Sequence, residues 1–402
     1  SYLVRSVLIA IERMSPMNRV SSYRNAGLAR SLSRREACAL GGVALALAGF
    51  GIAAPAWADA ASDAAKPADA ASGRPASADA VSTGEVAEHV AVPEGADDVP
   101  AEAVEVALPV TLTDDAGREV TVTSLERVVV CMGSFAKTWQ LAGGSLVGTT
   151  ADALADYELE GAENIASVGD FTAPNLEQIL ALDPTLVIMS AASAGRGGQS
   201  SQTDLVEPLE SAGVPVLTFK VTLFGDYLRM LRTCCDLTGR YDLYHENGLA
   251  TRDRIDEVLA AAAQARSASG EEAPTCLIMT TYSGGTRVLN SSTQSGAAAA
   301  DLGAVNLADQ NPSLLKDYSL ESVVALDPKF IFVMAMGNDP EAAERALKEQ
   351  TEDNPAWAGL TAVSEGRFIT LDPELFQYKP LEQWDEMYRT MAKNLYGDDV
   401  CA

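Results

Sequence analysis

One nine-residue motif occurs twice in the chain, as LEQILALDP over Leu176–Pro184 and as LESVVALDP over Leu320–Pro328. The two copies begin 144 residues apart and are identical at six of nine positions. Asn175 and Ser319, which precede the copies, are residue types that favour a helix N-cap. An apolar run follows each copy, TLVIMSA in the first case and KFIFVMA in the second. Each copy therefore predicts the same helix, turn and strand.

Around each copy, short apolar runs alternate with helical segments. In the first half we expect strands at 127–132, 145–150, 185–189 and 215–219, and helices at 175–182 and 204–212. In the second half we expect strands at 276–281, 330–334 and 367–371, and helices at 295–302, 319–326, 340–349 and 381–395. This alternation indicates βαβ units and mainly parallel sheets.

The apolar spacing between the two halves is helical from Tyr227, with a break at Gly239. Residues 242–265 predict one helix about 36 Å long. The predicted fold class is therefore α/β, with two Rossmann-like lobes and one long connecting helix. The expected parts are an N-terminal lobe at 108–223, a connecting helix at 224–268 and a C-terminal lobe at 274–399.

The N-terminal region has the features of an export signal. Arg34 and Arg35 precede a weakly apolar run at 37–54 and the sequence Ala56-Trp57-Ala58. We expect a twin-arginine-like signal peptide over 1–58, cleaved after about Ala58; an uncleaved anchor is the alternative. Residues 59–107 are rich in Ala, Ser, Pro and acidic residues, which predicts a disordered tether. The expected location is the periplasm or the outer face of the cell membrane.

The charge and the cysteines exclude some classes of protein. The net charge of −27, from 29 basic and 56 acidic residues, is the wrong sign for nucleic-acid binding. After the predicted signal, five cysteines remain without C-x-x-C spacing, which favours neither a disulfide framework nor a zinc site. Cys131 and Cys276 are expected in the core. Cys234 and Cys235 either occupy ordinary helix positions or form a bridge between neighbours.

Motifs of catalysis are absent from the sequence. It contains no Walker A motif, no G-x-S-x-G and no H-E-x-x-H. His245 is the one histidine of the predicted folded region, and its surroundings predict an exposed helix position. We therefore predict no catalytic residue, no protein metal site and no resident cofactor.

The chain from about Leu108 to Gly397 resembles the substrate-binding proteins of ABC importers for iron complexes, haem and cobalamin. The resemblance covers about 290 residues in the right order. It rests on LTDDAGREVTV (112–122), SVGDFTAPNLEQILALDPTLVI (167–188), LTGRYDLYHENGLA (237–250), DLGAVNLA (301–308), SLESVVALDPKFIFV (319–333) and NPAWAGLTAVSEGRFITLD (354–372).

The resemblance implies a role for the glutamate in each copy of the repeat. In such importers one surface glutamate per lobe pairs with arginines of the membrane permease, a dimer served by separate ATPase subunits. The matching residues here are Glu177 and Glu321. A structural alternative is that an acid in the first helical turn interacts favourably with the helix dipole. The two explanations are compatible.

In two-lobe α/β binding proteins the ligand lies at the C-terminal ends of the strands. From the first lobe this rule selects Ser134, Phe135, Phe171, Thr172, Ser193, Arg196 and Phe224. From the second it selects Tyr282, Ser283, Met336, Phe376, Tyr378 and Lys379. The aromatic residues are suited to stacking on a macrocycle or a catecholate, and Arg196 and Lys379 to pairing with an anionic group.

The expected ligand is an iron–siderophore, haem or a corrinoid. With two histidines after the signal, the chain lacks the clusters that hold a bare transition metal. For haem, Tyr282, Tyr378 or Met336 are candidate axial ligands. A surface protein that binds its ligand without a transporter is the alternative function.

Overall fold

The computed structural model describes residues 95–191, 202–282, 285–316, 319–335, 345, 347–348 and 355–401. The predicted signal peptide and residues 59–94 of the predicted tether lie outside these ranges. So does most of the helix expected at 340–349.

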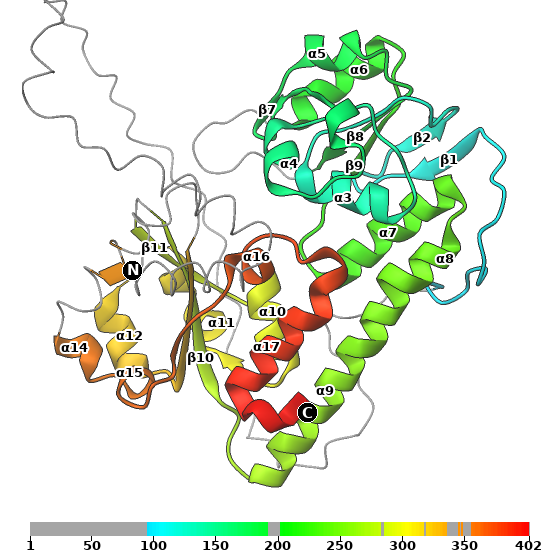
Figure 1. The fold of residues 1–402 in the computed structure, drawn as a ribbon. Coiled ribbons are helices and arrows are strands. Elements are labelled where there is room, and N and C mark those ends of the chain that lie inside the picture. The colour runs from blue at the N-terminus through cyan, green and yellow to red at the C-terminus, as the bar shows by residue number, and fades with distance from the viewer. Residues whose placement is uncertain are drawn as a thin grey trace, which may run out of the picture. The chain divides into compact units, whose positions relative to one another are not determined.

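The first lobe is built on a five-stranded parallel sheet in the order β5-β4-β3-β8-β9 (Figure 1). Its strands are β3 Val128–Val130, β4 Gly148–Thr149, β5 Ala166–Ser167, β8 Leu186–Ser190 and β9 Val216–Phe219. The helices are α3 Gly133–Leu141, α4 Ala151–Asp156, α5 Leu176–Ala181 and α6 Val206–Ser211. Two antiparallel hairpins accompany it, β1 Val110–Thr113 with β2 Glu119–Val122, and β6 Gly169–Asp170 with β7 Ala173–Pro174.

The second lobe repeats the parallel arrangement and adds one antiparallel edge strand. Its path is β11-β10-β13-β14, with β12 also paired to β10. The strands are β10 Thr275–Tyr282, β11 Gly285–Leu289, β12 Val305–Asn306, β13 Phe330–Ala335 and β14 Phe368–Thr370. The helices are α10 Gln294–Asp301, α11 Leu307–Gln310, α12 Leu320–Leu326, α14 Pro355–Ala358, α15 Thr361–Ser364, α16 Pro373–Phe376 and α17 Trp384–Tyr396. Short 3₁₀ turns are η1 Ala162–Asn164, η2 Gln202–Leu205, η4 Pro312–Leu315, η5 Leu381–Gln383 and η6 Asp398–Cys401.

Two helical segments join the lobes, drawn in green in Figure 1. Helix α7, Phe224–Thr238, ends at Gly239, which adopts a left-handed conformation with φ 72°. The chain then runs through α8 Tyr241–Tyr244, a π-helical turn at His245–Leu249 and α9 Ala250–Ser269. The predicted α/β class with two lobes and a long connecting helix is confirmed, and the break at Gly239 lies where the sequence predicts it.

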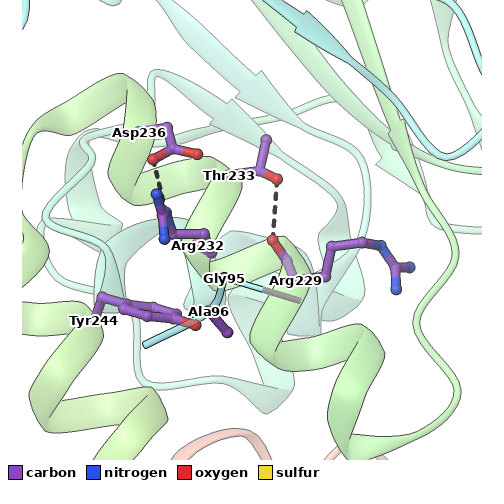
Figure 2. Close-up of a pocket in the computed structure, with 7 residues that line it drawn as sticks. All are labelled: Gly95, Ala96, Arg229, Arg232, Thr233, Asp236 and Tyr244. Atoms are coloured by element: carbon purple, nitrogen blue, oxygen red, sulfur yellow. Dashed lines mark hydrogen bonds and ion pairs between the residues drawn. The ribbon is translucent and has the colours of Figure 1, made fainter. Parts of the chain in front are cut away.

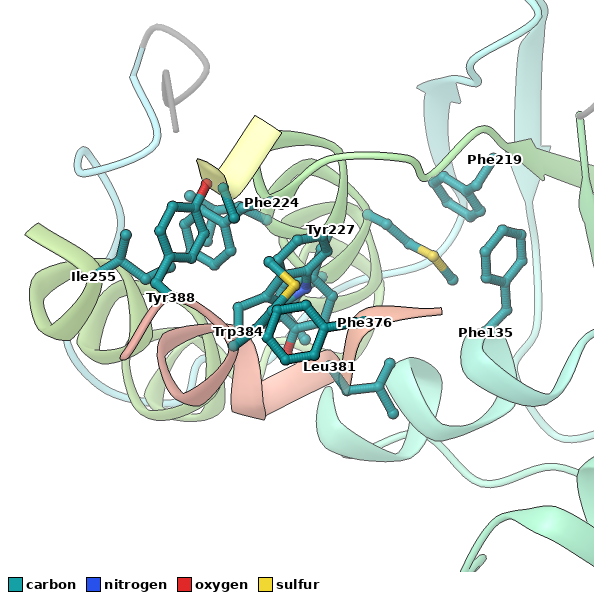
Figure 3. Close-up of a cluster of buried hydrophobic side chains, with 14 of the residues drawn as sticks. Phe135, Phe219, Phe224, Tyr227, Ile255, Phe376, Leu381, Trp384 and Tyr388 are labelled. Atoms are coloured by element: carbon teal, nitrogen blue, oxygen red, sulfur yellow. The ribbon is translucent and has the colours of Figure 1, made fainter. Parts of the chain in front are cut away.

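One face of each sheet packs into a single apolar cluster with the connecting helices and α17. The period of two along a strand decides which side chains take part. Val128 and Val130 of β3 join this cluster, whereas Val129 joins a second one on the opposite face. At its centre the rings of Phe224 and Trp384 meet edge to face, with centroids 5.9 Å apart (Figure 3).

The composition predicts a disordered tether through residue 107, and the structure corrects its end. The Val104 N–H donates to the Gly239 carbonyl at 2.8 Å, and His245 Nε2 lies 3.1 Å from the Pro100 carbonyl oxygen. Asp97 pairs with Arg252. Residues 95–107 therefore lie along the connecting helices. A segment poor in aromatics is ordered here because the helices supply partners for its backbone.

Lys379 connects the C-terminal lobe to the start of α7. Its Nζ donates to Gln294 Oε1 at 3.0 Å and to the Thr222 carbonyl at 3.3 Å. Burial lowers the pKa of Lys379 to about 8, and the nearby carboxylate of Asp226 only partly opposes this. The partly buried amine of Lys379 is thus held by two neutral oxygens, the side-chain oxygen of Gln294 in the C-terminal lobe and the carbonyl of Thr222 just before α7.

Gly239→Ala is expected to destabilise the protein by about 2–3 kcal/mol. An added Cβ would stand 2.0 Å from the Val104 carbonyl oxygen, on a backbone that disfavours side chains. Gly213→Ala is the matched control, because its φ is also positive at 82° but nothing lies within 4 Å of the added Cβ. In urea unfolding, the control variant should lose only about 1 kcal/mol of unfolding free energy, because of backbone strain. Equal losses would show that residues 95–107 do not pack on Gly239.

The free energy of unfolding should depend on pH through Lys379. Its folded pKa of about 8 lies below the unfolded value, so the unfolded chain holds the proton more tightly. The free energy of unfolding therefore rises as the pH rises from about 8 toward 10, because the partly buried amine loses its unfavourable charge. Relative to Lys379→Met, the wild type should gain on the order of 1 kcal/mol over this window in urea unfolding. Parallel profiles for the two proteins would contradict the lowered pKa.

Candidate functional site

The two copies of the repeat form helices α5 and α12 with the same local construction. Asn175 Oδ1 accepts from the Gln178 N–H at 3.0 Å, and Ser319 Oγ accepts from the Ser322 N–H at 3.4 Å. Burial follows the same order along both copies, and eight of the nine paired positions fall in the same class. Each helix leads into an inner strand of its sheet, β8 or β13. The sequence repeat is therefore a repeat of structure.

The turn after each helix uses an aspartate in the left-handed region, with φ 48° at Asp183 and 41° at Asp327. Asp327 accepts from the N–H and the hydroxyl of Thr361, both at 2.7 Å, and these bonds lower its pKa. In the first lobe Arg127 Nε donates to the Asp183 carbonyl at 3.1 Å. Different partners thus hold the same strained turn, which indicates that the direction from helix to strand must be kept.

Glu177 and Glu321 are both exposed in the first turns of these helices. Among the residues that the structure describes, neither carboxylate has a hydrogen bond or an ion pair. The capping bonds come from Asn175 and Ser319 instead. The glutamates remain close to the positive end of the helix dipole, yet their oxygens are free for a partner.

Three aromatic residues predicted to contact ligand lie in the core, and for their side chains the prediction is wrong. Phe135, Phe224 and Phe376 are almost fully buried. Phe135 packs edge to face on Phe219 at 6.3 Å (Figure 3). All three lie in helices and belong to one apolar cluster, in which Phe135 contacts Phe219 of β9 and Phe224 contacts Trp384 of α17. A position near a strand end is therefore not enough to expose a side chain.

Phe171 and Tyr378 are exposed at 46% and 49%, as a stacking role requires. Tyr282 is partly buried, and the guanidinium of Arg287 lies 5.0 Å from its ring centroid. Thr172 is also partly buried. Ser134 is buried at the start of α3, next to Tyr157. Ser193, Arg196, Ser283 and Met336 lie outside the described residues.

Two buried glutamines that were not among the predicted site residues hold the loops of these exposed aromatics. Gln202 Nε2 donates to the carbonyls of Cys131 at 2.7 Å and Phe171 at 2.6 Å, while its Oε1 accepts from the Ser190 N–H at 2.8 Å. It thereby joins the ends of β3 and β8 to the Phe171 loop. No sequence signal marks this residue, because its partners are backbone groups brought together by the sheet.

Gln294 has the corresponding position in the second lobe. Its Nε2 donates to the Tyr378 carbonyl at 2.5 Å and to the Leu375 carbonyl at 3.3 Å. Its Oε1 accepts from Lys379. The loop with Tyr378 and Lys379 is thus pre-organised by a buried amide, as is the loop of Phe171.

A cavity of about 190 Å³ lies elsewhere, beside α7 and the start of the described chain (Figure 2). Its lining residues are Gly95, Ala96, Arg229, Arg232, Thr233, Asp236 and Tyr244. Its charges are already paired, since Arg232 binds Asp236 at 2.8 Å and Arg229 binds Asp115 at 2.8 Å. None of the predicted ligand contacts lines it, and we interpret it as a feature of packing.

The cysteines are not arranged for a metal or a disulfide within the described ranges. Cys131, Cys234, Cys235 and Cys276 are buried free thiols, so Cys234 and Cys235 occupy ordinary helix positions. Burial raises the pKa of Cys131 and Cys276 to about 12. No cluster of three or more potential metal ligands occurs in the part of the chain that the structure describes.

None of the helices in the described ranges is both long enough and apolar enough to span a membrane.

Several solved structures of binding proteins share this fold. A structure of an ABC transporter substrate-binding protein from Listeria monocytogenes is 20% identical, with a TM-score of 0.54 over 67% of this chain and 98% of that one. A periplasmic haem-binding protein from Pseudomonas aeruginosa is 25% identical, with a TM-score of 0.52 over 67% and 92%. Staphylococcus aureus SirA, complexed with staphyloferrin B, is 17% identical, with a TM-score of 0.55 over 72% and 98%. No curated protein matches the chain.

Residues 128–375, more than half of the sequence, match the family described as periplasmic binding protein. This region includes both sheets, both copies of the repeated helix and the helices that connect them. The chain therefore belongs to the periplasmic binding protein family.

Proposed function

We propose that this protein is the extracytoplasmic solute-binding subunit of an ABC importer. The observation that carries the proposal is the repeated helix, which presents an exposed glutamate at the same position of each lobe, unpaired among the described residues. The helix dipole favours an acid at this position in each copy, and that role is compatible with docking. The N-cap bonds come from Asn175 and Ser319, so the carboxylates are available to a partner. A permease with two equivalent halves is a partner that would use both.

We further propose an iron–siderophore, haem or a corrinoid as the ligand. Haem and staphyloferrin B are the ligands named for two of the structures that this chain resembles. In this chain Phe171 and Tyr378 offer exposed rings, and their loops are held by buried amides. Lys379 adds a partly buried amine beside Tyr378, although two neutral oxygens already bind it. Rigid rings and few polar contacts suit a large, flat or chelated ligand.

The ligand class can be read from what co-purifies with the exported protein. A Soret band would identify haem, a corrinoid spectrum a cobalamin-like ligand, and a ligand-to-metal charge-transfer band an iron–siderophore, each with its mass. In titration with the identified compound, Phe171→Ala and Tyr378→Ala should each weaken binding about tenfold. Phe219→Leu, in the core, is the control that should leave affinity unchanged. If the protein binds none of the three kinds of compound, the proposed ligand class is wrong.

Charge reversal tests delivery separately from capture. Glu177→Lys with Glu321→Lys should reduce uptake into cells at least about tenfold, because like charges then face the basic residues of the permease. Ligand affinity should not change. Glu207→Lys is the matched control, since Glu207 is also exposed in the first turn of a six-residue helix. Normal uptake by the double variant would favour a surface protein that binds its ligand without a transporter.

A further inference from the structure

Each repeated helix also exposes a large apolar side chain. Leu180 is 37% exposed and Val324 is 38% exposed. These residues occupy the same position in the two copies, three residues after Glu177 and Glu321 respectively. Residues three apart lie on one side of a helix, so each helix shows an acid and an apolar group together. Few other large apolar residues are as exposed in the described ranges, and none of them recurs at an equivalent position.

The fold does not require an apolar residue at this position. Other residues make the core contacts of α5 and α12. Ile179 and Val323 are fully buried, and the partly buried Leu176, Leu182, Leu320 and Leu326 pack against the same clusters. A single exposed leucine or valine is ordinary on a protein surface. Two exposed apolar residues at matched positions of the two lobes are less ordinary. The residue type differs between the copies, Leu in one and Val in the other, but both are apolar. The following residue, Ala181 or Ala325, is exposed and small in both copies, which permits close approach.

We propose that Leu180 and Val324 are docking residues, which together with Glu177 and Glu321 form two matched patches for a membrane permease. The inference rests on the proposed transport function and names the chemistry of its partner. Each half of the permease would offer a basic side chain to the carboxylate and an apolar surface to the neighbouring Leu or Val. The charged pair sets orientation and association rate, and the apolar contact slows dissociation. The duplication in this chain matches two equivalent halves in the partner.

The test measures binding of the full-length, ligand-free protein to the permease–ATPase complex of the same organism, held in lipid nanodiscs. Leu180→Ser with Val324→Ser should raise the Kd about tenfold or more, at both low and high salt. Glu177→Lys with Glu321→Lys should weaken binding most strongly at low salt, because salt screens charges but not apolar contacts. Unchanged thermal midpoints would show that the variants are folded.

Two controls make the result specific. Leu315→Ser removes an apolar residue that is equally exposed, at 36%, but lies outside the repeat, and it should bind as the wild type does. Leu180→Val with Val324→Leu keeps the apolar class and should retain the affinity. If the double serine variant binds normally while the lysine variant does not, the inference fails and the transport function stands. If neither variant affects binding, the transport function itself fails. An equal loss with Leu315→Ser would also overturn the inference.

Discussion

The apolar cluster along α7, α9 and α17 joins both sheets to the connecting helices and limits how the lobes can move. One face of each sheet contributes to it, through Val128 and Val130 in the first lobe and Ile278 and Phe332 in the second. The connecting helices are thus more than a tether, because their side chains form part of both cores. Separating the lobes would expose this surface to water, at roughly 25 cal/mol for each Å² of apolar area. We therefore expect small movements of the lobes rather than wide hinge closure.

This rigidity has a consequence for the loops that carry the candidate site. Gln202 and Gln294 each bind backbone carbonyls of a loop that exposes an aromatic ring. A buried amide keeps such bonds because leaving its partners unsatisfied is costly. The loops are held ready for a ligand, and the energy of binding is not spent on ordering them. On the repeated helices the acid and its apolar neighbour are likewise presented without local rearrangement.

Where sequence reasoning failed, the reason was the direction of side chains. Phe135, Phe224 and Phe376 follow strand ends as a ligand contact should, but the helices that contain them turn the rings into the core. The segment 95–107 has the composition of a tether, yet it binds helices whose positions depend on residues more than a hundred places away. Gln202 and Gln294 escaped notice because their partners are carbonyl groups, which no sequence pattern specifies. In each case the deciding contact is remote in the chain.

The α/β class, the two lobes, the break at Gly239 and the repeated helix with its glutamates could all be predicted from the sequence. All of these depend on local signals: the periodicity of apolar residues, N-cap residues and a duplicated motif. Three features depend on how the chain folds. The carboxylates of Glu177 and Glu321 have no partner among the described residues, Leu180 and Val324 are exposed, and Phe171 and Tyr378 rather than the buried phenylalanines face solvent. Exposure and pairing arise from packing between distant segments, and the local sequence does not encode which surface remains uncovered.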